Sequence, residues 1–247
     1  MIDLVKINPR EIPFPYPLVA LLCGARARQP PHALTVFNYD RRGHGESGFT
    51  APYAVEREIE DRDAILDEAG GSAYIYGTSG CAVLALTAAF SGLAPKMKKL
   101  ATWEPSYIVV GSRPPVPADY REQLSALLSE GRRGDMIEFF MIQAVGMPAE
   151  AVAMMRQATR GPGQEAFAPT LIYDATVMGD YAPPTERLAT IQVPTLVIDG
   201  GQTPWLSLSA DTVASALPHA QRGAIPGQPH NVEESALAPV LMAFFGA

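Results

Sequence analysis

The sequence predicts an α/β fold, in which a mostly parallel sheet carries helices on both faces and a helical insertion. Two observations favour this fold. Strand and helix patterns alternate over residues 34–105 and again from residue 193, as in successive βαβ units. Between them, residues 111–190 contain several helical patterns and no strand pattern. We therefore predict a sheet core formed by residues 1–110 and 191–247, with residues 111–190 as a helical cap over the carboxyl ends of the strands.

The predicted elements follow from local patterns. Strands are expected where β-branched and aromatic residues form short runs: "ALTVFNYD" (33–40), "AYIYG" (73–77), "KLATWEP" (99–105), "VPTLVIDGG" (193–201) and a run at 220–225. Helices are expected where apolar residues recur at helical spacing: 53–71, 80–91, 118–132, 134–145, 148–159, 164–178, 206–217 and 232–245.

The composition argues against several classes of function. The 247 residues carry a formal net charge of −7, whereas nucleic-acid and anionic-membrane surfaces need basic patches. No apolar run reaches about 18 residues, so no transmembrane helix is expected, and the first residues lack a signal-peptide pattern. Cys23 and Cys81 fit neither a metal site nor a disulfide framework, which indicates a reducing, cytoplasmic setting.

Ser79 is the first candidate catalytic residue. It lies in "YIYGTSGCAVLAL" (74–86), where a predicted strand meets a predicted helix through small residues. A serine hydroxyl is a weak nucleophile that needs an adjacent base. On a sharp strand-to-helix turn, its oxygen stands above the sheet, and the Gly80 N–H points to the same place near a helix N-terminus. The alternative is that Ser79 is only a small residue that the turn accommodates.

This stretch resembles the G-x-S-x-G nucleophile elbow of the α/β-hydrolase family, with Cys81 in place of the last glycine. Three further stretches resemble that family in the same order. "YDRRGHGESG" is similar to the turn after its fourth strand, "VPTLVIDGG" to its penultimate strand, and "IPGQPHNV" to its histidine loop. The resemblance implies an α/β-hydrolase fold with Ser79 as nucleophile, the Gly80 N–H as an oxyanion donor, and neither a cofactor nor a metal ion.

The same resemblance assigns the general base to His230, because it lies between a short predicted strand and the last helix. Histidine suits proton transfer near neutral pH, since its unperturbed pKa is about 6.5. We interpret the other histidines, His32, His44 and His219, as turn or surface residues. An ordinary loop histidine remains the alternative for His230.

The acid that orients this histidine has more than one candidate. The family usually places an aspartate in a G-x-x-D context, but here Thr203 occupies that position. Fungal zearalenone lactonases look similar to this sequence in having a glutamate after the preceding strand and a G-x-x-T-P stretch. That resemblance implies Glu104, in "TWEPSY", as the acid, with Asp199 as the second choice. Asp174 and Asp180, in the insertion, are more distant choices. Alternatively, Glu104 is a strand-end carboxylate bonded to backbone N–H groups.

The N-terminal region departs most from the family, which has a longer segment before the strand at 34–40. We therefore predict that the N-terminal strands are shortened or missing. That segment also supplies the family's second oxyanion donor. Residues 21–25 ("LLCGA") are either a remnant of it, with Cys23 or Gly24 near the site, or part of a helix.

These residues predict a serine hydrolase that cleaves a carboxylic ester or lactone through an acyl-enzyme. The insertion is rich in methionine and aromatic residues, which suggests a small, fairly hydrophobic substrate. The same fold and triad also serve cofactor-free perhydrolases and C–C bond hydrolases. A degenerate member that binds a ligand without turnover is a third hypothesis, favoured by Cys81, Thr203 and the altered N-terminal region. No feature of the sequence indicates the oligomeric state.

Overall fold

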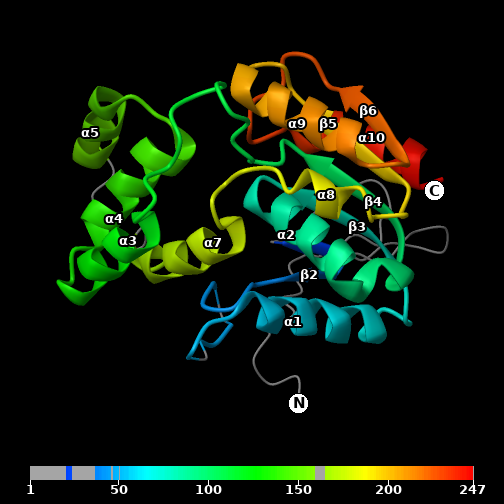
Figure 1. Cartoon of the computed structure of the whole chain (residues 1–247), viewed down its shortest axis with the longest axis horizontal. Helices are drawn as coiled ribbons and strands as arrows, with labels where there is room; N and C mark the ends of the chain where they lie inside the picture. The colour runs from blue at the N-terminus through cyan, green and yellow to red at the C-terminus, as the bar shows by residue number, and fades with distance from the viewer. Residues whose placement is uncertain (1–20, 24–36, 46, 50, 159–164, 247) are drawn as a thin grey trace.

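The computed structural model describes residues 21–23, 37–45, 47–49, 51–158 and 165–246 (Figure 1). Its strands are β1 (Leu21–Cys23), β2 (Phe37–Tyr39), β3 (Ala73–Thr78), β4 (Met97–Trp103), β5 (Thr195–Asp199) and β6 (Ala220–Ala224). β1 pairs with β2, and β3, β4, β5 and β6 pair in that order, all in parallel. β1 also lies beside β3. The predicted parallel sheet is therefore confirmed.

Helices connect and cover these strands. Those before β5 are α1 (Val55–Glu68), α2 (Gly80–Ala88), α3 (Tyr120–Ser129), α4 (Arg133–Phe140), α5 (Ala149–Ala158), α7 (Leu171–Met178) and α8 (Thr185–Leu188). Those after it are α9 (Pro204–Ala216) and α10 (Glu234–Phe245). Short helical turns of other types extend α2 over residues 89–96 and α4 over Met141–Val145. The sequence pattern does not predict α8, whose 4 residues are too few to show a period.

Successive residues of the central strands face opposite sides of the sheet, and both sides are covered. The α10 side is formed by Trp103, Ile198, Leu237, Leu241 and Phe245 with their neighbours. The opposite side, towards α1, α2 and α9, includes Leu100, Val197, Ile65, Leu86 and Val213. Each large apolar side chain buried in this way contributes about 1.5–3 kcal/mol. The prediction of helices on both faces is confirmed.

The segment between β4 and β5 is helical wherever the structure describes regular elements in it. In Figure 1, α3, α4 and α5 stand to the left of the sheet. α3 packs on α4 and α7, and α7 also packs on α1 and α2. Helix α7 therefore joins this segment to the sheet domain. The division into a core (1–110 and 191–247) and a cap (111–190) stays a prediction.

The structure decides between strand and helix for only three residues of the N-terminal region. Residues 21–23 form the strand β1, so "LLC" belongs to the sheet and not to a helix. Residues 1–20 and 24–36, including Gly24, lie outside the described part of the chain. The predicted shortening of the N-terminal strands falls on those residues.

A buried ion-pair network attaches α7 to the sheet domain. Arg41, in the loop after β2, donates from Nε and Nη2 to the two carboxylate oxygens of Glu58 on α1, at 3.0 and 2.7 Å. Its Nη1 donates to Asp174 Oδ1 on α7 at 2.6 Å. The Tyr53 hydroxyl donates to Glu58 at 3.0 Å, and the Tyr53 ring stacks on that of Tyr173. The side chains of Arg41 and Glu58 are 5% and 0% exposed, so this pairing takes place away from water.

Glu58→Gln is expected to lower the free energy of unfolding by about 3–5 kcal/mol at pH 7, because it leaves Arg41 incompletely paired in a buried site. Burial opposes the ionisation of Glu58, but the charge and hydrogen bonds of Arg41 lower the pKa of this carboxyl overall. Such a carboxyl stabilises the fold above its unfolded pKa of about 4.3, and this contribution is lost as the pH falls through the folded pKa.

Urea titrations of the wild type and Glu58→Gln at pH 7 and below pH 4 check this expectation. The difference between the two proteins should be large at pH 7 and smaller in acid. Glu56→Gln is the control, because Glu56 is exposed on the same helix. Equal effects of the two substitutions at pH 7 would show that the buried pair is not a major stabilising contact.

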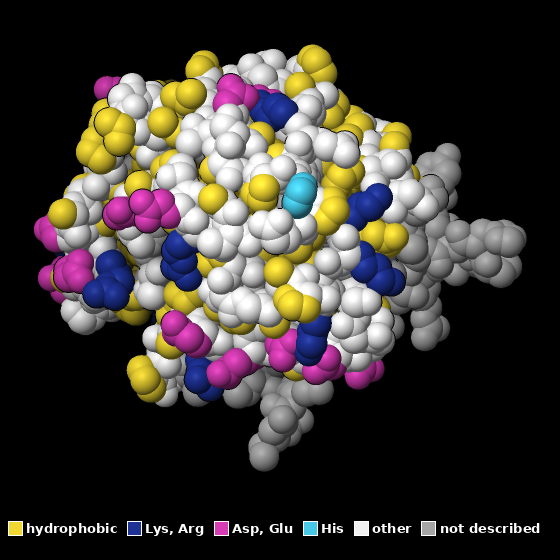
Figure 2. Space-filling model, turned by 45° about the vertical axis from the view of Figure 1, so that its right-hand side comes forward, with side chains coloured by type: hydrophobic (Ala, Val, Ile, Leu, Met, Phe, Trp, Pro, Cys, Tyr) yellow, Lys and Arg dark blue, Asp and Glu magenta, His cyan; other side chains and the backbone are white. Residues whose placement is uncertain are grey.

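None of the described helices combines the length and the apolar character that a membrane span requires. On the face shown in Figure 2, acidic and basic side chains are interspersed, and the basic ones do not gather into one continuous patch.

Candidate active site

Ser79 occupies the turn between β3 and α2. Its φ of 54° and ψ of −125° are values that residues other than glycine rarely adopt, and they cost about 1–3 kcal/mol. The Ser79 N–H donates to Trp103 O of β4 at 2.9 Å, and the Ser79 carbonyl accepts from Ala82 N at 3.0 Å. These contacts hold the strained turn on both sides. Ser79 therefore stands at the carboxyl end of β3, directly before the N-terminus of α2.

Close packing between β3 and α2 explains the need for a small residue at Gly77. A Cβ atom added at Gly77 would lie 2.6 Å from Cys81 O and 2.9 Å from Ala82 Cα. A Cβ atom added at Gly80 would meet nothing within 4 Å. The two glycines that flank Ser79 in the motif are therefore not equivalent.

Gly77→Ala is expected to lower the free energy of unfolding by about 1–3 kcal/mol, because the backbone of α2 must shift to admit the methyl group. Gly80→Ala is expected to change it by less than about 1 kcal/mol, since the first helical position has open space around it. Chemical denaturation of both variants beside the wild type measures the difference. Equal losses at the two positions would contradict the close approach at Gly77.

His230 and Glu104 are hydrogen-bonded to each other. His230 Nδ1 lies 2.6 Å from Glu104 Oε2, and the glutamate side chain is 1% exposed, whereas that of the histidine is 41% exposed. Glu104 directly follows β4, and His230 lies in the loop between β6 and α10. A carboxylate accepts only, so in the neutral imidazole Nδ1 is assigned the hydrogen and Nε2 keeps a lone pair. This tautomer leaves Nε2 able to take a proton.

Further hydrogen bonds hold both Glu104 and His230 in place. Glu104 Oε1 accepts from Gly200 N at 3.1 Å, because β4 and β5 are neighbours and end side by side. Glu104 also has a positive φ, 45°, which is rare for a residue with a side chain. Trp103 Nε1 donates to His230 O at 2.9 Å and so anchors the histidine loop. No sequence pattern predicts that Trp103 bonds to the histidine loop. Its position directly before Glu104 is the one feature of the sequence that indicates a place near the site.

Asp199, the second choice for the acid, is bonded to other groups. It accepts from Ser207 Oγ and from Gly201 N, the latter at 3.1 Å, and it pairs with Arg222 Nη2 at 2.7 Å. Burial opposes its ionisation, but the hydrogen bonds from Ser207 and Arg222 lower the pKa of Asp199 overall. Asp199 therefore acts as an ionised anchor at the start of α9.

The remaining candidates also have partners of their own. Asp174 binds Arg41, Asp180 accepts from Ala182 N, His44 contacts Thr170, and His219 contacts Gln192. His32 lies outside the described residues. The structure thus brings His230 to Glu104, and it has no hydrogen bond between His230 and Ser79 within the described ranges. Catalytic hydrogen bonds are often long before substrate is present.

Gly80 is the first residue of α2, so its N–H has no acceptor inside the helix. A negatively charged oxygen beside Ser79 would meet this N–H and the positive end of the helix dipole. The sequence places a possible second donor near Cys23 or Gly24; Cys23 is the last residue of β1, and Gly24 lies outside the described residues.

Comparison with known proteins gives a family. The model of the alpha/beta hydrolase family matches residues 12–241. The chain belongs to the α/β-hydrolase family. A solved α/β hydrolase from Sphaerobacter thermophilus DSM 20745 has 46% sequence identity and a TM-score of 0.84, over 98% of this chain and 96% of that chain. The family resemblance noted in the sequence is therefore confirmed. No curated protein matches the sequence.

Two other α/β-hydrolase structures share the fold at lower identity. One is 2-hydroxy-6-oxo-6-phenylhexa-2,4-dienoate hydrolase from Rhodococcus sp. strain RHA1, with 20% identity and a TM-score of 0.63 over 94% of this chain and 91% of that chain. The other is the enol-lactonase from Burkholderia xenovorans LB400, with 18% identity and a TM-score of 0.64 over 98% and 96%. At these identities the likeness concerns the fold alone.

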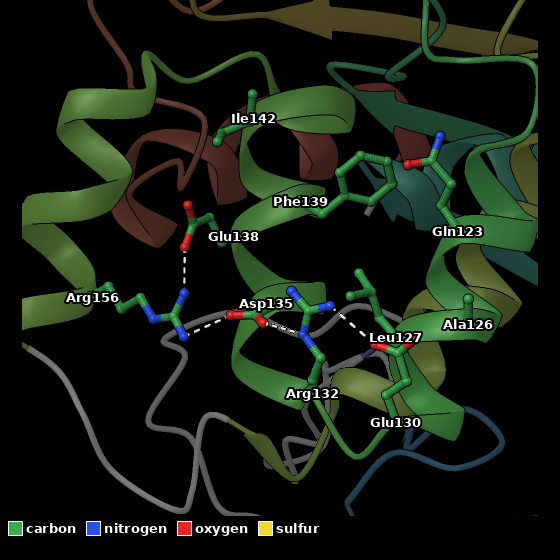
Figure 3. A pocket seen from close by; sticks show the side chains of 10 residues that line it. All are labelled: Gln123, Ala126, Leu127, Glu130, Arg132, Asp135, Glu138, Phe139, Ile142 and Arg156. Atoms are coloured by element: carbon green, nitrogen blue, oxygen red, sulfur yellow. Dashed lines mark hydrogen bonds and ion pairs between the residues drawn. The ribbon is translucent and has the colours of Figure 1, made fainter.

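A cavity of about 500 Å³ lies between α3, α4 and α5, away from the residues described above. Figure 3 shows its apolar wall, which includes Leu127 and Phe139, and its rim of ion pairs. Arg132 and Arg156 on this rim pair with Glu130, Asp135 and Glu138. Because the rim charges are already paired and no candidate catalytic residue lines the cavity, it is not the candidate active site.

Proposed function

We propose that the protein is a serine hydrolase that cleaves a carboxylic ester or a lactone of a small, fairly hydrophobic substrate. The observation that carries the proposal is the 2.6 Å contact between His230 Nδ1 and Glu104 Oε2. It is supported by the strained position of Ser79 at the start of α2. A serine on such a turn needs a base, and a base needs an orienting acid.

In this mechanism the Ser79 hydroxyl attacks the substrate carbonyl while His230 Nε2 takes its proton. The carbonyl oxygen becomes an oxyanion and accepts a hydrogen bond from the Gly80 N–H. Collapse of this intermediate forms the acyl-enzyme and expels the alcohol, which takes the proton from His230. Water then attacks the acyl-enzyme and gives a proton to His230. The Ser79 Oγ–acyl bond breaks to release the acid, and His230 returns that proton to Ser79 Oγ. In a lactone the expelled alcohol stays attached to the acyl group, so the product is one hydroxy acid.

Glu104 has two tasks in this mechanism. It keeps the hydrogen of the neutral imidazole on Nδ1, and it stabilises the imidazolium that forms when Nε2 takes the proton. The carboxylate is suited to both because it is buried and held by Gly200 N. A charge interaction is stronger in such a site than in water.

C–C bond hydrolysis is the second candidate. It is supported by solved neighbours whose names describe meta-cleavage product hydrolases, although these share the fold alone. The same serine and histidine would act on a ketone carbonyl and expel a carbon leaving group. Perhydrolysis and ligand binding without turnover remain hypotheses from the sequence.

A substrate panel tests the proposal. Wild type and Ser79→Ala are incubated with aryl and alkyl esters, with five- to seven-membered lactones, and with vinylogous 1,5-diketones as C–C substrates. Acid release is followed at constant pH, and the acyl-enzyme is sought by intact-mass spectrometry. We expect Ser79-dependent hydrolysis of the esters or lactones and an adduct of acyl mass. Turnover of the diketones alone would replace the ester assignment with C–C hydrolysis, and no turnover would favour a binding protein.

A further inference from the structure

Arg113 lies near the start of the helical insertion, after β4, and contacts both the insertion and the sheet domain. Its Cζ is 4.9 Å from the centre of the Trp205 ring, which belongs to the first turn of α9. Its Nη1 donates to Ala144 O at 2.8 Å and its Nη2 to Gln143 O at 2.6 Å. The guanidinium is therefore fixed in orientation from two sides, by a ring of the sheet domain and by two carbonyls of the insertion.

Arg113 is partly buried and has no carboxylate partner within the described residues. Its side chain carries five N–H donors, and the two carbonyls use only one hydrogen each on Nη1 and Nη2. Nε makes no hydrogen bond to a described residue. Burial lowers the pKa of the Arg113 guanidinium, whereas the pKa of Arg41, which has two carboxylate partners, is raised despite burial.

The position of Arg113 relates it to the candidate active site. Trp205 lies in the first turn of α9, a few residues after the end of β5. Between them is Gly200, whose N–H donates to Glu104 Oε1. Tyr181 is within electrostatic range of Arg113, and its carbonyl accepts from Ile108 N, four residues after Glu104, at 2.7 Å. The guanidinium therefore stacks on a residue at the start of α9, which follows the carboxyl end of β5, and this edge is where open α/β sheets bind their ligands.

Capping of a helix end accounts for part of this arrangement. The two carbonyls belong to the last turn of the α4 extension, where a cation is favoured by the helix dipole. Capping uses one side of the guanidinium fork. It leaves Nε without a hydrogen bond to a described residue, in a guanidinium that lies between the Trp205 ring and Gly146.

We propose that Arg113 binds a carboxylate of the substrate, so that the substrate is an ester or lactone carrying a free carboxylate apart from the reacting carbonyl. The reacting group, an ester or lactone, rests on the proposed function, whereas the binding of a carboxylate by Arg113 does not depend on it. Arginine pairs with carboxylates through two parallel N–H groups, and a guanidinium held on an aromatic ring loses little freedom when it does so.

Two matched esters test the proposal. One is the 4-nitrophenyl monoester of adipic acid, whose second carboxyl is free, and the other carries a methyl ester on that carboxyl. In the wild type we expect a higher kcat/KM for the anionic ester. In Arg113→Gln, the ratio of kcat/KM for the anionic ester to that for the neutral ester is expected to fall about 10- to 100-fold, mainly through KM.

Two variants separate anion binding from a structural task. Arg113→Lys keeps the charge and should recover part of the ratio, although it loses the fork. Arg187→Gln is the control, because Arg187 also stacks on an aromatic ring, Phe90, but lies on α8. A merely structural role of Arg113 would lower the rates of both esters alike and leave their ratio at the wild-type value, which would overturn the proposal.

Calorimetric binding of the two esters to Ser79→Ala protein distinguishes this failure from failure of the proposed function. We expect tighter binding of the anionic ester, and loss of that preference when Arg113→Gln is added. If the wild type hydrolyses neither ester but the binding preference is present and depends on Arg113, the hydrolase proposal fails and the anion site stands. If both esters bind equally to Ser79→Ala, the anion site is wrong whatever the hydrolytic result.

Discussion

Ser79→Ala is expected to lower kcat for the best ester or lactone by about 10⁴- to 10⁶-fold, because the substitution removes the attacking oxygen. The loss should appear in kcat and kcat/KM alike, since the oxygen forms its new bond only on the way to the transition state. Alanine has the size of serine without the hydroxyl, and Ser79 Oγ makes no hydrogen bond to a described residue. The fold should therefore be retained. Steady-state kinetics with product-acid detection measures the loss.

Ser91→Ala serves as the matched control, because Ser91 is exposed in the turn after α2. It should hydrolyse the same substrate at a rate close to that of the wild type. Circular dichroism and thermal unfolding should show that both variants are folded. Retention of more than a few per cent of the wild-type kcat in folded Ser79→Ala would exclude Ser79 as the nucleophile.

Glu104→Gln is expected to lower kcat by about 10³- to 10⁴-fold. Glutamine can still accept from Gly200 N, but its amide NH₂ would face His230 Nδ1 and favour the tautomer with the hydrogen on Nε2. That tautomer cannot take the proton from Ser79. The corresponding substitution in a serine protease has an effect of about 10⁴-fold for the same reason. Pre-steady-state acylation rates between pH 6 and pH 9 measure the step in which the effect should occur.

Asp199→Asn is the control for the acid. It removes a charge that pairs with Arg222 and accepts from Ser207, so we expect a loss of stability of about 1–3 kcal/mol. Its acylation rate should remain within a few-fold of that of the wild type. If Asp199→Asn loses far more activity than Glu104→Gln, the acid is Asp199, and the hydrogen bond between Glu104 and His230 has only a structural role.

Much of the arrangement follows from local sequence. The small residues around Ser79 predict a tight turn, and Gly77 meets that expectation because a Cβ atom there would collide with α2. The alternation of strand and helix patterns predicts that β3, β4 and β5 run parallel, as they do. Once these strands are neighbours, Glu104 and Gly200 lie at the same edge of the sheet, where the histidine loop can reach them.

Other features depend on contacts between segments far apart in the chain. Nothing local distinguishes strand from helix for Leu21–Cys23, because three apolar residues show no period and only pairing with β2 decides. The Trp103 indole donates to His230 O, which is 127 positions away in the sequence, and Arg113 donates to carbonyls 30 and 31 positions away. Tryptophan and arginine at these spacings form no recognisable motif, so the sequence alone does not predict these hydrogen bonds.

The central claim, that His230 and Glu104 activate Ser79, is tested most directly by labelling the folded protein with a fluorophosphonate probe and locating the adduct by peptide mass spectrometry. We expect an adduct on Ser79 in the wild type, none at that position in Ser79→Ala, and labelling at least 10²-fold slower in His230→Ala and Glu104→Gln. No labelling of the folded wild type, or labelling that is unchanged in His230→Ala and Glu104→Gln, would contradict the claim.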